Sequence, residues 1–301
     1  MPLPPARAAS PSPASHRPTS RRLLLTALGA SLLAVPALAY RAADAATAAG
    51  TATDTAAETA AETAADTGLD DPAKKDIAMR LVSSAENSSL EWEEQYDYVE
   101  DIGDGRGYTG GIIGFCSGTS DMLALVELYT ERVADNPLAD YAPALRAVNG
   151  TDSHEGLDPG FPDAWREAAA TAAFRTAQRD ERDRVYFDPA VARAKEDGLG
   201  ALGQFVYYDA MVMHGPGTDT LSFGGIRGRA LLQAASPTEG GDETGFLHAF
   251  LDARGWAMEQ EEAHSDVSRV ETAQRVFLAA GNLALDPPLN WRVYGDSYTL
   301  S

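Results

Sequence analysis

Two acidic residues, Glu86 and Asp104, have sequence settings that suit acid–base catalysis. Glu86 follows directly on an apolar helical pattern, and Asp104 lies further along in a turn that is rich in glycine. Gly103 and Gly105 allow a ligand to come close to the backbone there. Hydrolysis of a glycosidic bond uses such a pair, because one carboxyl group protonates the leaving oxygen while the other acts as base or nucleophile. The sequence therefore predicts a glycosidase.

Thr109 lies beside this turn and adds a hydroxyl group that can hold a water molecule. A base that activates water for attack from the opposite face of the sugar needs such an orienting group, and an inverting pair of carboxyl groups is about 6.5–9.5 Å apart. The alternative is that Glu86 and Asp104 are two surface acids among the 45 acidic residues of the chain. Their settings favour the catalytic interpretation.

A helix over residues 71–85 is predicted to position Glu86. Asp70 or Asp71 can cap its start, and Pro72 suits the first turn. One apolar face repeats with helical spacing, at Ile77, Ala78, Leu81, Val82 and Ala85. Glu86 is thereby expected at the edge of the core, and residues 108–115 are expected to form the strand portion of a small hairpin or sheet.

The rest of the chain is predicted to be mainly helical. We expect helices at 122–129 after a Thr119 cap, 138–148, 161–182 as one long helix, a short one from Asp188, 199–213, 243–264 and 268–280, and an extended tail over 285–301. The predicted fold class is mainly α, or α+β, with one short sheet and two lobes. Asp209 stands alone in the apolar segment 199–213, where a buried aspartate requires a partner.

The N-terminus reads as an export signal over residues 1–39. Arg21 and Arg22 precede an apolar run that ends in the small-x-small pattern Ala37-Leu38-Ala39. The paired arginines suggest the twin-arginine route. The alternative is a membrane anchor, but the run is short and contains Pro36, which makes a poor span. We therefore expect a secreted, extracellular protein with no membrane contact after the signal is removed.

Residues 40–67 consist almost entirely of Ala, Thr, Asp and Glu. They offer no large apolar side chain after Tyr40, so we expect a disordered linker or pro-segment. An isolated helix is the alternative, and the threonines and the missing apolar stripe disfavour it. The catalytic domain is accordingly predicted to span residues 68–301.

The net charge of −21 makes nucleic acid an improbable partner and suits a polycationic substrate. The alternative is that the acidity only keeps the protein soluble. The single cysteine, Cys116, forms no internal disulfide and is expected to be a buried small residue rather than a nucleophile. No nucleotide loop, no His-Glu-x-x-His motif and no Gly-x-Ser-x-Gly motif is present, so no cofactor and no metal are expected.

Long stretches of the chain resemble one known family. They are Leu-Val-Ser-Ser-Ala-Glu-Asn-Ser-Ser at 81–89, residues 98–118, Asn149-Gly150, residues 180–189 and Met-His-Gly-Pro-Gly at 213–217. Across essentially all of residues 68–301 the chain resembles the chitosanases of glycoside hydrolase family 46, of the Streptomyces type. The resemblance implies a lysozyme-like fold with a small β-sheet in the minor lobe and a cleft between the lobes. It also implies endo-hydrolysis of β-1,4 links between glucosamine units, with inversion.

The resemblance further implies roles for individual residues. Glu86 would be the general acid, Asp104 the general base, and Thr109 the residue that positions water. Contacts to chitosan or glucosamine oligosaccharides would come from Ser88, Tyr98, Arg106, Thr119, Asp121, His264 and Asp296. Asp121 could pair with a substrate ammonium group. We expect a monomer.

A buried ion network of Asp209, Arg254 and Arg269 behind Asp104 is also implied, and it would give Asp209 its partner. The chain departs from the family pattern at Ser265, where an acid is expected after His264. Two rival functions remain. One is a muramidase that uses Glu86 on cell-wall glycan, although an anionic substrate would be repelled by the charge of −21. The other is a non-catalytic chitosan-binding protein, which should have lost Glu86, Asp104 or Thr109.

Overall fold

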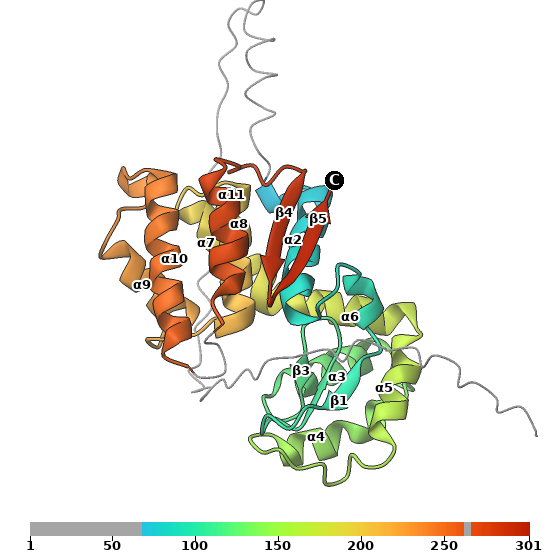
Figure 1. Ribbon diagram of the computed structural model, residues 1–301. Coiled ribbons are helices and arrows are strands. Elements are labelled where there is room, and N and C mark those ends of the chain that lie inside the picture. The colour runs from blue at the N-terminus through green and yellow to red at the C-terminus, as the bar shows by residue number, and fades with distance from the viewer. Residues whose placement is uncertain (1–67, 262–265) are drawn as a thin grey trace, which may run out of the picture.

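The structure is a computed structural model that describes residues 68–261 and 266–301 (Figure 1). The predicted signal peptide, the predicted linker, His264 and Ser265 lie outside the described residues. The described part is mainly helical, with a three-stranded and a two-stranded antiparallel sheet. Its buried apolar side chains form two separate clusters, one for each lobe. The predicted mainly-α or α+β class with two lobes is confirmed.

The minor lobe carries the three-stranded sheet. Its strands are β1 (Val99–Asp101), β2 (Tyr108–Gly110) and β3 (Phe115–Cys116), in the order β1-β2-β3. Its helices are α3 (Asp121–Arg132), α4 (Ala142–Val148), α5 (Phe161–Ala169) and α6 (Ala172–Arg182). Its cluster is rich in buried aromatic rings, among them Phe115, Tyr129, Phe161, Trp165 and Phe174. The sheet and the loop before β2 therefore rest on a rigid base.

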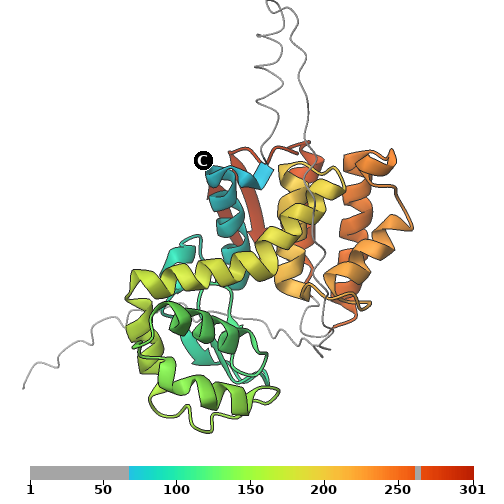
Figure 2. The same cartoon turned by 180° about the vertical axis from the view of Figure 1, so that it is seen from behind.

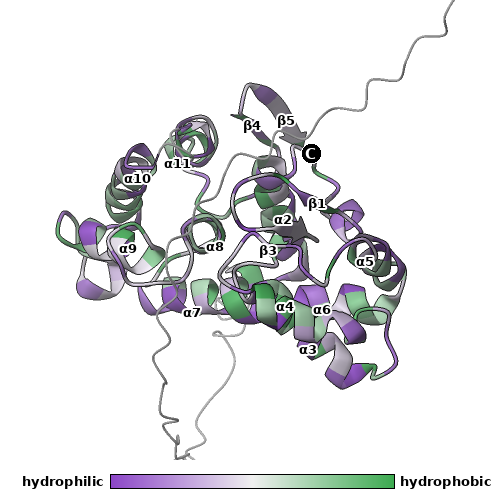
Figure 3. Cartoon of the chain, turned by 90° about the horizontal axis from the view of Figure 1, so that it is seen from below, coloured by the Kyte–Doolittle hydropathy of each residue, from purple (hydrophilic) through white to green (hydrophobic). Residues whose placement is uncertain are grey.

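The major lobe contains the larger cluster. Its helices are α2 (Pro72–Glu86), α7 (Asp188–Glu196), α8 (Ala201–His214), α9 (Phe223–Leu231), α10 (Glu243–Glu259) and α11 (Arg275–Ala279), and its strands are β4 (Leu289–Val293) and β5 (Asp296–Leu300). Every residue of α8 except Val212 is buried, as predicted for the central helix. Figure 3 shows the contrast in hydropathy, since α8 is mainly green whereas purple recurs along α6. Among the described residues, no helix combines the length and apolarity that a membrane span needs.

Short helical turns complete the chain. They are the 3-10 helices Gly68–Asp70, Trp92–Gln95, Ala139–Tyr141 and Pro237–Glu239, and the π-helical segments Asp183–Phe187 and Val270–Gln274. The segment Asp183–Phe187 joins α6 to α7, so that one long, bent helical run passes from the minor lobe into the major lobe (Figure 2).

Trp92 lies at the junction of the lobes and packs against both apolar clusters. Its indole N–H donates to Asp76 Oδ1 at 3.0 Å, and the guanidinium of Arg182 lies 5.4 Å from the ring centroid. Lys75 in α2 pairs with Asp183 in the π-helical segment at 2.8 Å. The lobes are thus joined by the packing of Trp92 and by charged contacts from Asp76, Arg182 and the Lys75–Asp183 pair.

Helix α2 forms as the sequence predicts. Asp71 occupies the N-cap position, and its side chain accepts hydrogen bonds from the backbone N–H groups of Ala73 and Lys74. Pro72 takes the first turn, where its missing N–H has no partner to lose. Glu86 is the last residue of the helix. The cap and the apolar face together fix the end of α2 that carries this carboxyl group.

The single helix predicted over 161–182 is wrong, because the structure has two helices there. Thr171 caps the second one, accepting a hydrogen bond from Phe174 N at 3.2 Å and donating one to Ala168 O at 2.7 Å. Threonine competes with the helical backbone in this way wherever its hydroxyl can reach a free carbonyl. The chain therefore turns between α5 and α6 although the apolar periodicity continues.

The predicted extended tail is a β-hairpin, and helix α9 was not predicted. Leu289, Trp291 and Val293 alternate inward along β4, and Trp291 Nε1 donates to Ser84 Oγ of α2 at 3.0 Å. The turn between the strands is Tyr294-Gly295, with φ of 52° and 91°. Two positive φ values match a two-residue turn of the primed type, which usually has Asn or Asp where this chain has tyrosine.

We predict that Asp71→Ala lowers the free energy of unfolding by roughly 0.5–2 kcal/mol, because two backbone N–H groups of α2 lose their acceptor. Urea unfolding followed by circular dichroism measures the change. Glu167→Ala, which removes an exposed carboxylate of α5, is the control. Equal stability of the two variants would contradict the assigned cap.

Candidate active site

Glu86 faces the major lobe at the end of α2. Its side chain is 11% exposed, and Arg269 Nη1 donates to Glu86 Oε1 at 2.7 Å. Asn87 closes the helix, with its backbone N–H bonded to Ser83 O at 2.7 Å. Glu86 is thus a nearly buried carboxyl group with one oxygen held by a buried arginine.

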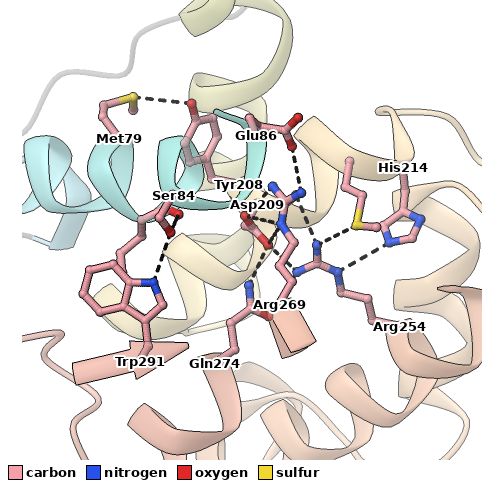
Figure 4. A network of polar contacts seen from close by, with 12 residues as sticks. Met79, Ser84, Glu86, Tyr208, Asp209, His214, Arg254, Arg269, Gln274 and Trp291 are labelled. Carbon is pink, nitrogen blue, oxygen red and sulfur yellow. Dashed lines mark hydrogen bonds and ion pairs between the residues drawn. The ribbon is translucent and has the colours of Figure 1, made fainter. Parts of the chain in front are cut away.

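Behind Glu86 lies an ion network that is closed to solvent (Figure 4). Arg269 donates to Asp209 Oδ1 from Nε and Nη2, at 2.9 and 2.7 Å. Arg254 Nη1 and Gln274 Nε2 donate to Asp209 Oδ2 at 2.6 and 2.7 Å. Burial by itself would raise the pKa of Asp209, but the charges of Arg269 and Arg254 outweigh it and lower the pKa to about 2.

The structure therefore brings Asp209, Arg254 and Arg269 together, but their position relative to the two acids was wrongly expected. The network contacts Glu86 rather than Asp104. The physical reason is the division into lobes. Asp209 and Arg254 belong to helices of the major lobe, as Glu86 does, whereas Asp104 lies in the loop between β1 and β2 of the minor lobe.

Asp104 has its own cation. Arg106 donates to Asp104 Oδ2 from Nε at 2.8 Å and from Nη2 at 2.5 Å, and its backbone N–H donates to Asp104 Oδ1 at 3.0 Å. The side chain of Asp104 has no exposed surface. Gly103 and Gly105 take φ of 71° and 81° on either side of it, which lets the loop fold tightly enough for this contact.

Thr109 lies in β2 directly opposite Cys116 in β3. Its Oγ1 is 3.3 Å from Cys116 Sγ. Both residues are buried, at 2% and 1% exposure. Burial, together with the negative charge of Asp121, raises the pKa of Cys116 to about 11, so the thiol stays protonated at neutral pH. This agrees with the expectation of a buried small residue rather than a nucleophile.

Asp121 begins α3. Its Oδ1 accepts hydrogen bonds from Thr119 Oγ1 at 2.7 Å and from the backbone N–H groups of Cys116 and Met122, both at 2.9 Å. Burial raises the pKa of Asp121, although these hydrogen bonds oppose the shift. Thr119 was expected to cap α3, but Ser120 has the cap position and Thr119 supports Asp121 instead. Oδ2 of Asp121 has no hydrogen-bond partner within the described residues.

Three of the other predicted contact residues are wholly or partly exposed. Ser88 is exposed and has φ of 52°, just beyond the end of α2. The hydroxyl of Tyr98 donates to Glu100 Oε2 at 3.3 Å. Asp296 is exposed at the start of β5. Tyr98 belongs to the minor lobe, whereas Ser88 and Asp296 belong to the major lobe. His264 lies outside the described residues.

Sequence reasoning missed two tyrosines near the acids. Tyr186 lies in the π-helical segment. Burial raises its pKa, and Asp121 and Cys116 raise it further. Burial also raises the pKa of Tyr294, while Arg269 opposes the shift. A π-helical segment has no clear sequence signature, but Gly295 after the alternating apolar residues of β4 was a readable turn signal. Across residues 68–261 and 266–301, no three His, Cys, Asp or Glu side chains are arranged to hold a metal ion.

Comparison with known proteins identifies the family of this chain. The model of glycosyl hydrolase family 46 matches residues 80–289. The chain belongs to glycosyl hydrolase family 46. Within it, the chain is 66% identical over 233 residues to a chitosanase of Streptomyces sp. (strain N174), with 77% of this chain and 84% of the relative covered. A chitosanase of Nocardioides sp. (strain N106) is 63% identical over the same shares of each chain.

Solved structures of the family agree with the fold. A chitosanase in a co-crystal structure with substrate is 61% identical, with a TM-score of 0.77, and the match covers 78% of this family 46 chain and 100% of that one. A second chitosanase complex is 62% identical with a TM-score of 0.76 and covers 78% and 99% of the two chains. The family membership and the lysozyme-like fold that the resemblance implied are confirmed.

We predict that Asp209→Asn lowers the free energy of unfolding by about 3–5 kcal/mol at pH 7, because the carboxylate that pairs with both buried guanidinium groups loses its charge and Arg269 is left with Glu86 alone. The pKa of Asp209 falls from 3.8 to about 2 on folding, so its ionised form stabilises the native state above pH 4. That contribution, about 2 kcal/mol, is lost as the pH falls toward 2.

Urea unfolding at pH 7, 4 and 2.5 tests both statements. The variant should lack the part of the acid destabilisation that belongs to Asp209, while Asp163→Asn, at an exposed surface pair, should follow the wild type. Identical pH dependence in wild type and Asp209→Asn would show that the network is not ionised as described.

Proposed function

We propose that this chain is an endo-acting chitosanase that cleaves β-1,4 links between glucosamine units with inversion of configuration. One observation carries the mechanism: each acid has its own cation, Arg269 for Glu86 and Arg106 for Asp104, on separate lobes. Two carboxyl groups that are held in place independently, one from each lobe, can act from opposite faces of a sugar. The chitosanases among its relatives support the substrate.

In the proposed reaction Glu86 is the general acid and Asp104 the general base. Asp104 takes one proton from a water molecule, whose oxygen forms a bond to the anomeric carbon. The bond from that carbon to the bridging oxygen breaks, and its electron pair stays on the bridging oxygen, which receives the proton of Glu86. Asp104 is left protonated and Glu86 ionised, so one proton must return between them through solvent before the next turnover.

The geometry of Asp104 is compatible with that role. A carboxylate offers about four lone-pair directions. Arg106 occupies three of them with its Nε, Nη2 and backbone N–H donors. The fourth direction has no hydrogen-bond donor among the described residues, and we propose that it receives the attacking water and that Thr109 fixes the other side of that water. Arg106, to which the family resemblance gave a substrate contact, is therefore proposed also to orient the base.

Recognition of glucosamine is proposed to depend on Asp121. Its Oδ1 is fixed by three donors, which leaves Oδ2 for a substrate ammonium group. Ser88, Tyr98, Arg106, Thr119, His264 and Asp296 are proposed to contact the rest of the sugar chain. The net charge of −21 raises the local concentration of a cationic polymer. We propose that the enzyme acts as a monomer and needs no cofactor.

We also propose that the enzyme works outside the cell after removal of residues 1–39, with residues 40–67 as a linker. The paired arginines, the apolar run and the small residues at its end support export.

We predict that Glu86→Gln and Asp104→Asn each lower kcat on highly deacetylated chitosan by about 10²–10⁴-fold, because each keeps the shape of the side chain and removes its proton chemistry. Release of reducing ends measures the rate, and binding of glucosamine hexamer by calorimetry shows whether the site is still formed. Glu93→Gln, an exposed acid in the same region, is the matched control.

Chitin and bacterial cell wall are the comparison substrates. Cleavage of cell wall rather than chitosan would move the assignment to a muramidase. Binding of chitosan without cleavage by the wild type would leave a non-catalytic binding protein, and full activity in either variant would reject the assigned acids.

We predict that replacing both Arg21 and Arg22 by lysine abolishes export through the twin-arginine route, since that route reads the arginine pair. Expression in a bacterial host with and without that pathway, followed by N-terminal sequencing of secreted protein, tests this. Unchanged secretion of the double variant would favour the general secretory route.

A further inference from the structure

We propose that Cys116 is a positioning residue that fixes the direction of the Thr109 hydroxyl, so that Thr109 accepts a hydrogen bond from the attacking water instead of donating one. This inference rests on the proposed function, in which Thr109 holds that water. It gives Cys116, which the sequence indicated only as a buried small residue, a part in the proposed reaction.

The two side chains face each other on one side of the sheet. Thr109 and Cys116 are direct cross-strand partners in β2 and β3, and neighbours of this kind point the same way. Thr109 Oγ1 and Cys116 Sγ are 3.3 Å apart, and either atom could be the donor by distance alone. The question is which of the two gives its hydrogen.

Counting hydrogens answers it. A thiol has one hydrogen, and burial keeps it on the sulfur by raising the pKa of Cys116 to about 11. Cys116 Sγ is also 3.2 Å from the carbonyl oxygen of Gly114, which can only accept. No backbone N–H of the described residues donates to that carbonyl. The thiol hydrogen therefore belongs to Gly114, and the hydrogen between Cys116 and Thr109 is that of the Thr109 hydroxyl.

The surroundings hold this arrangement in place. The backbone N–H of Cys116 donates to Asp121 Oδ1 at 2.9 Å, and Gly114 takes φ of 74° in the turn between β2 and β3. Cys116 is thus held by its backbone bond to Asp121, by its thiol contact to Gly114 and by its pairing with Thr109 across the sheet. With its own hydrogen directed at the sulfur, Thr109 has only lone pairs left to offer.

This direction matters for the attack. A water that gives one hydrogen to Asp104 and the other to Thr109 keeps a lone pair for the anomeric carbon. If Thr109 donated instead, it would engage one of the two lone pairs of the water and draw electron density from the oxygen that forms the new bond. The hydrogen given to Asp104 leaves as the proton of the reaction, and the one shared with Thr109 remains on the new anomeric hydroxyl of the product.

Infrared spectroscopy tests the direction without any measurement of activity. Cys116 is the only cysteine, so its S–H stretch is a single band. If the thiol donates to Gly114, Thr109→Val should leave the band at the low wavenumber of a hydrogen-bonded thiol. A shift of the band to the wavenumber of a free thiol in Thr109→Val would show that the thiol donates to Thr109 and would overturn the proposal.

Kinetics tests the consequence. Cys116→Ala removes the acceptor of the Thr109 hydroxyl and should lower kcat on chitosan about 10- to 100-fold, with KM within about twofold, because the water is less well oriented. Cys116→Ser keeps one hydrogen and an acceptor and should restore most of the loss. In a Thr109→Val background, Cys116→Ala should change kcat by less than about twofold, since residues that act through one another are not additive.

The outcomes separate this inference from the proposed function. Equal losses from Cys116→Ala in both backgrounds would show a structural role only and reject the inference, and so would full activity of Thr109→Val while Glu86→Gln stays inactive. Circular dichroism and thermal unfolding of each variant show whether it folds. If Cys116→Ala does not fold, the infrared band of the wild type and Thr109→Val decides alone.

Discussion

The guanidinium of Arg269 is divided between two carboxyl groups, and the position of Glu86 depends on that division. Two hydrogen bonds from Arg269 converge on Asp209 Oδ1, and a third nitrogen reaches Glu86 at 2.7 Å. Arg254 and Gln274 hold the other oxygen of Asp209. Breaking a buried pair of this kind is costly because the remaining charge has no solvent. The helices that carry these groups are therefore held in one arrangement, and the end of α2 with them.

The minor lobe uses a different solution for Asp104. Its cation is only two residues away in the chain, and glycines on both sides allow the loop to close on itself. A local contact of this type needs no second element to form correctly. The two acids are thus supported by unlike devices, one buried deep between helices and one folded within a single loop. Each carboxyl group is therefore fixed in position without the help of the other lobe.

Sequence reasoning succeeded where the signal is local. The cap at Asp71 and the apolar face of α2 predicted where Glu86 lies, and the glycines around Asp104 predicted a tight turn. It failed where distant segments decide. A lone aspartate in an apolar helix shows that partners exist but not which acid they face, and the family resemblance placed the network of Asp209 behind the wrong carboxyl group. The break at Thr171 and the pairing of β4 with β5 are local, and they were missed because apolar periodicity reveals neither a capping hydroxyl nor a two-residue turn.

Glu86 and Asp104 rest on different hydrophobic cores, and those cores meet at Trp92 and along the helical run from α6 to α7. The separation of the two carboxyl groups is therefore a property of a joint rather than of either core. Lys75 and Asp183 pair across this joint, so substitutions there would change the angle between the lobes and with it the separation of the acids. Stability within each lobe and the spacing of the acids can accordingly evolve, or be engineered, as independent quantities.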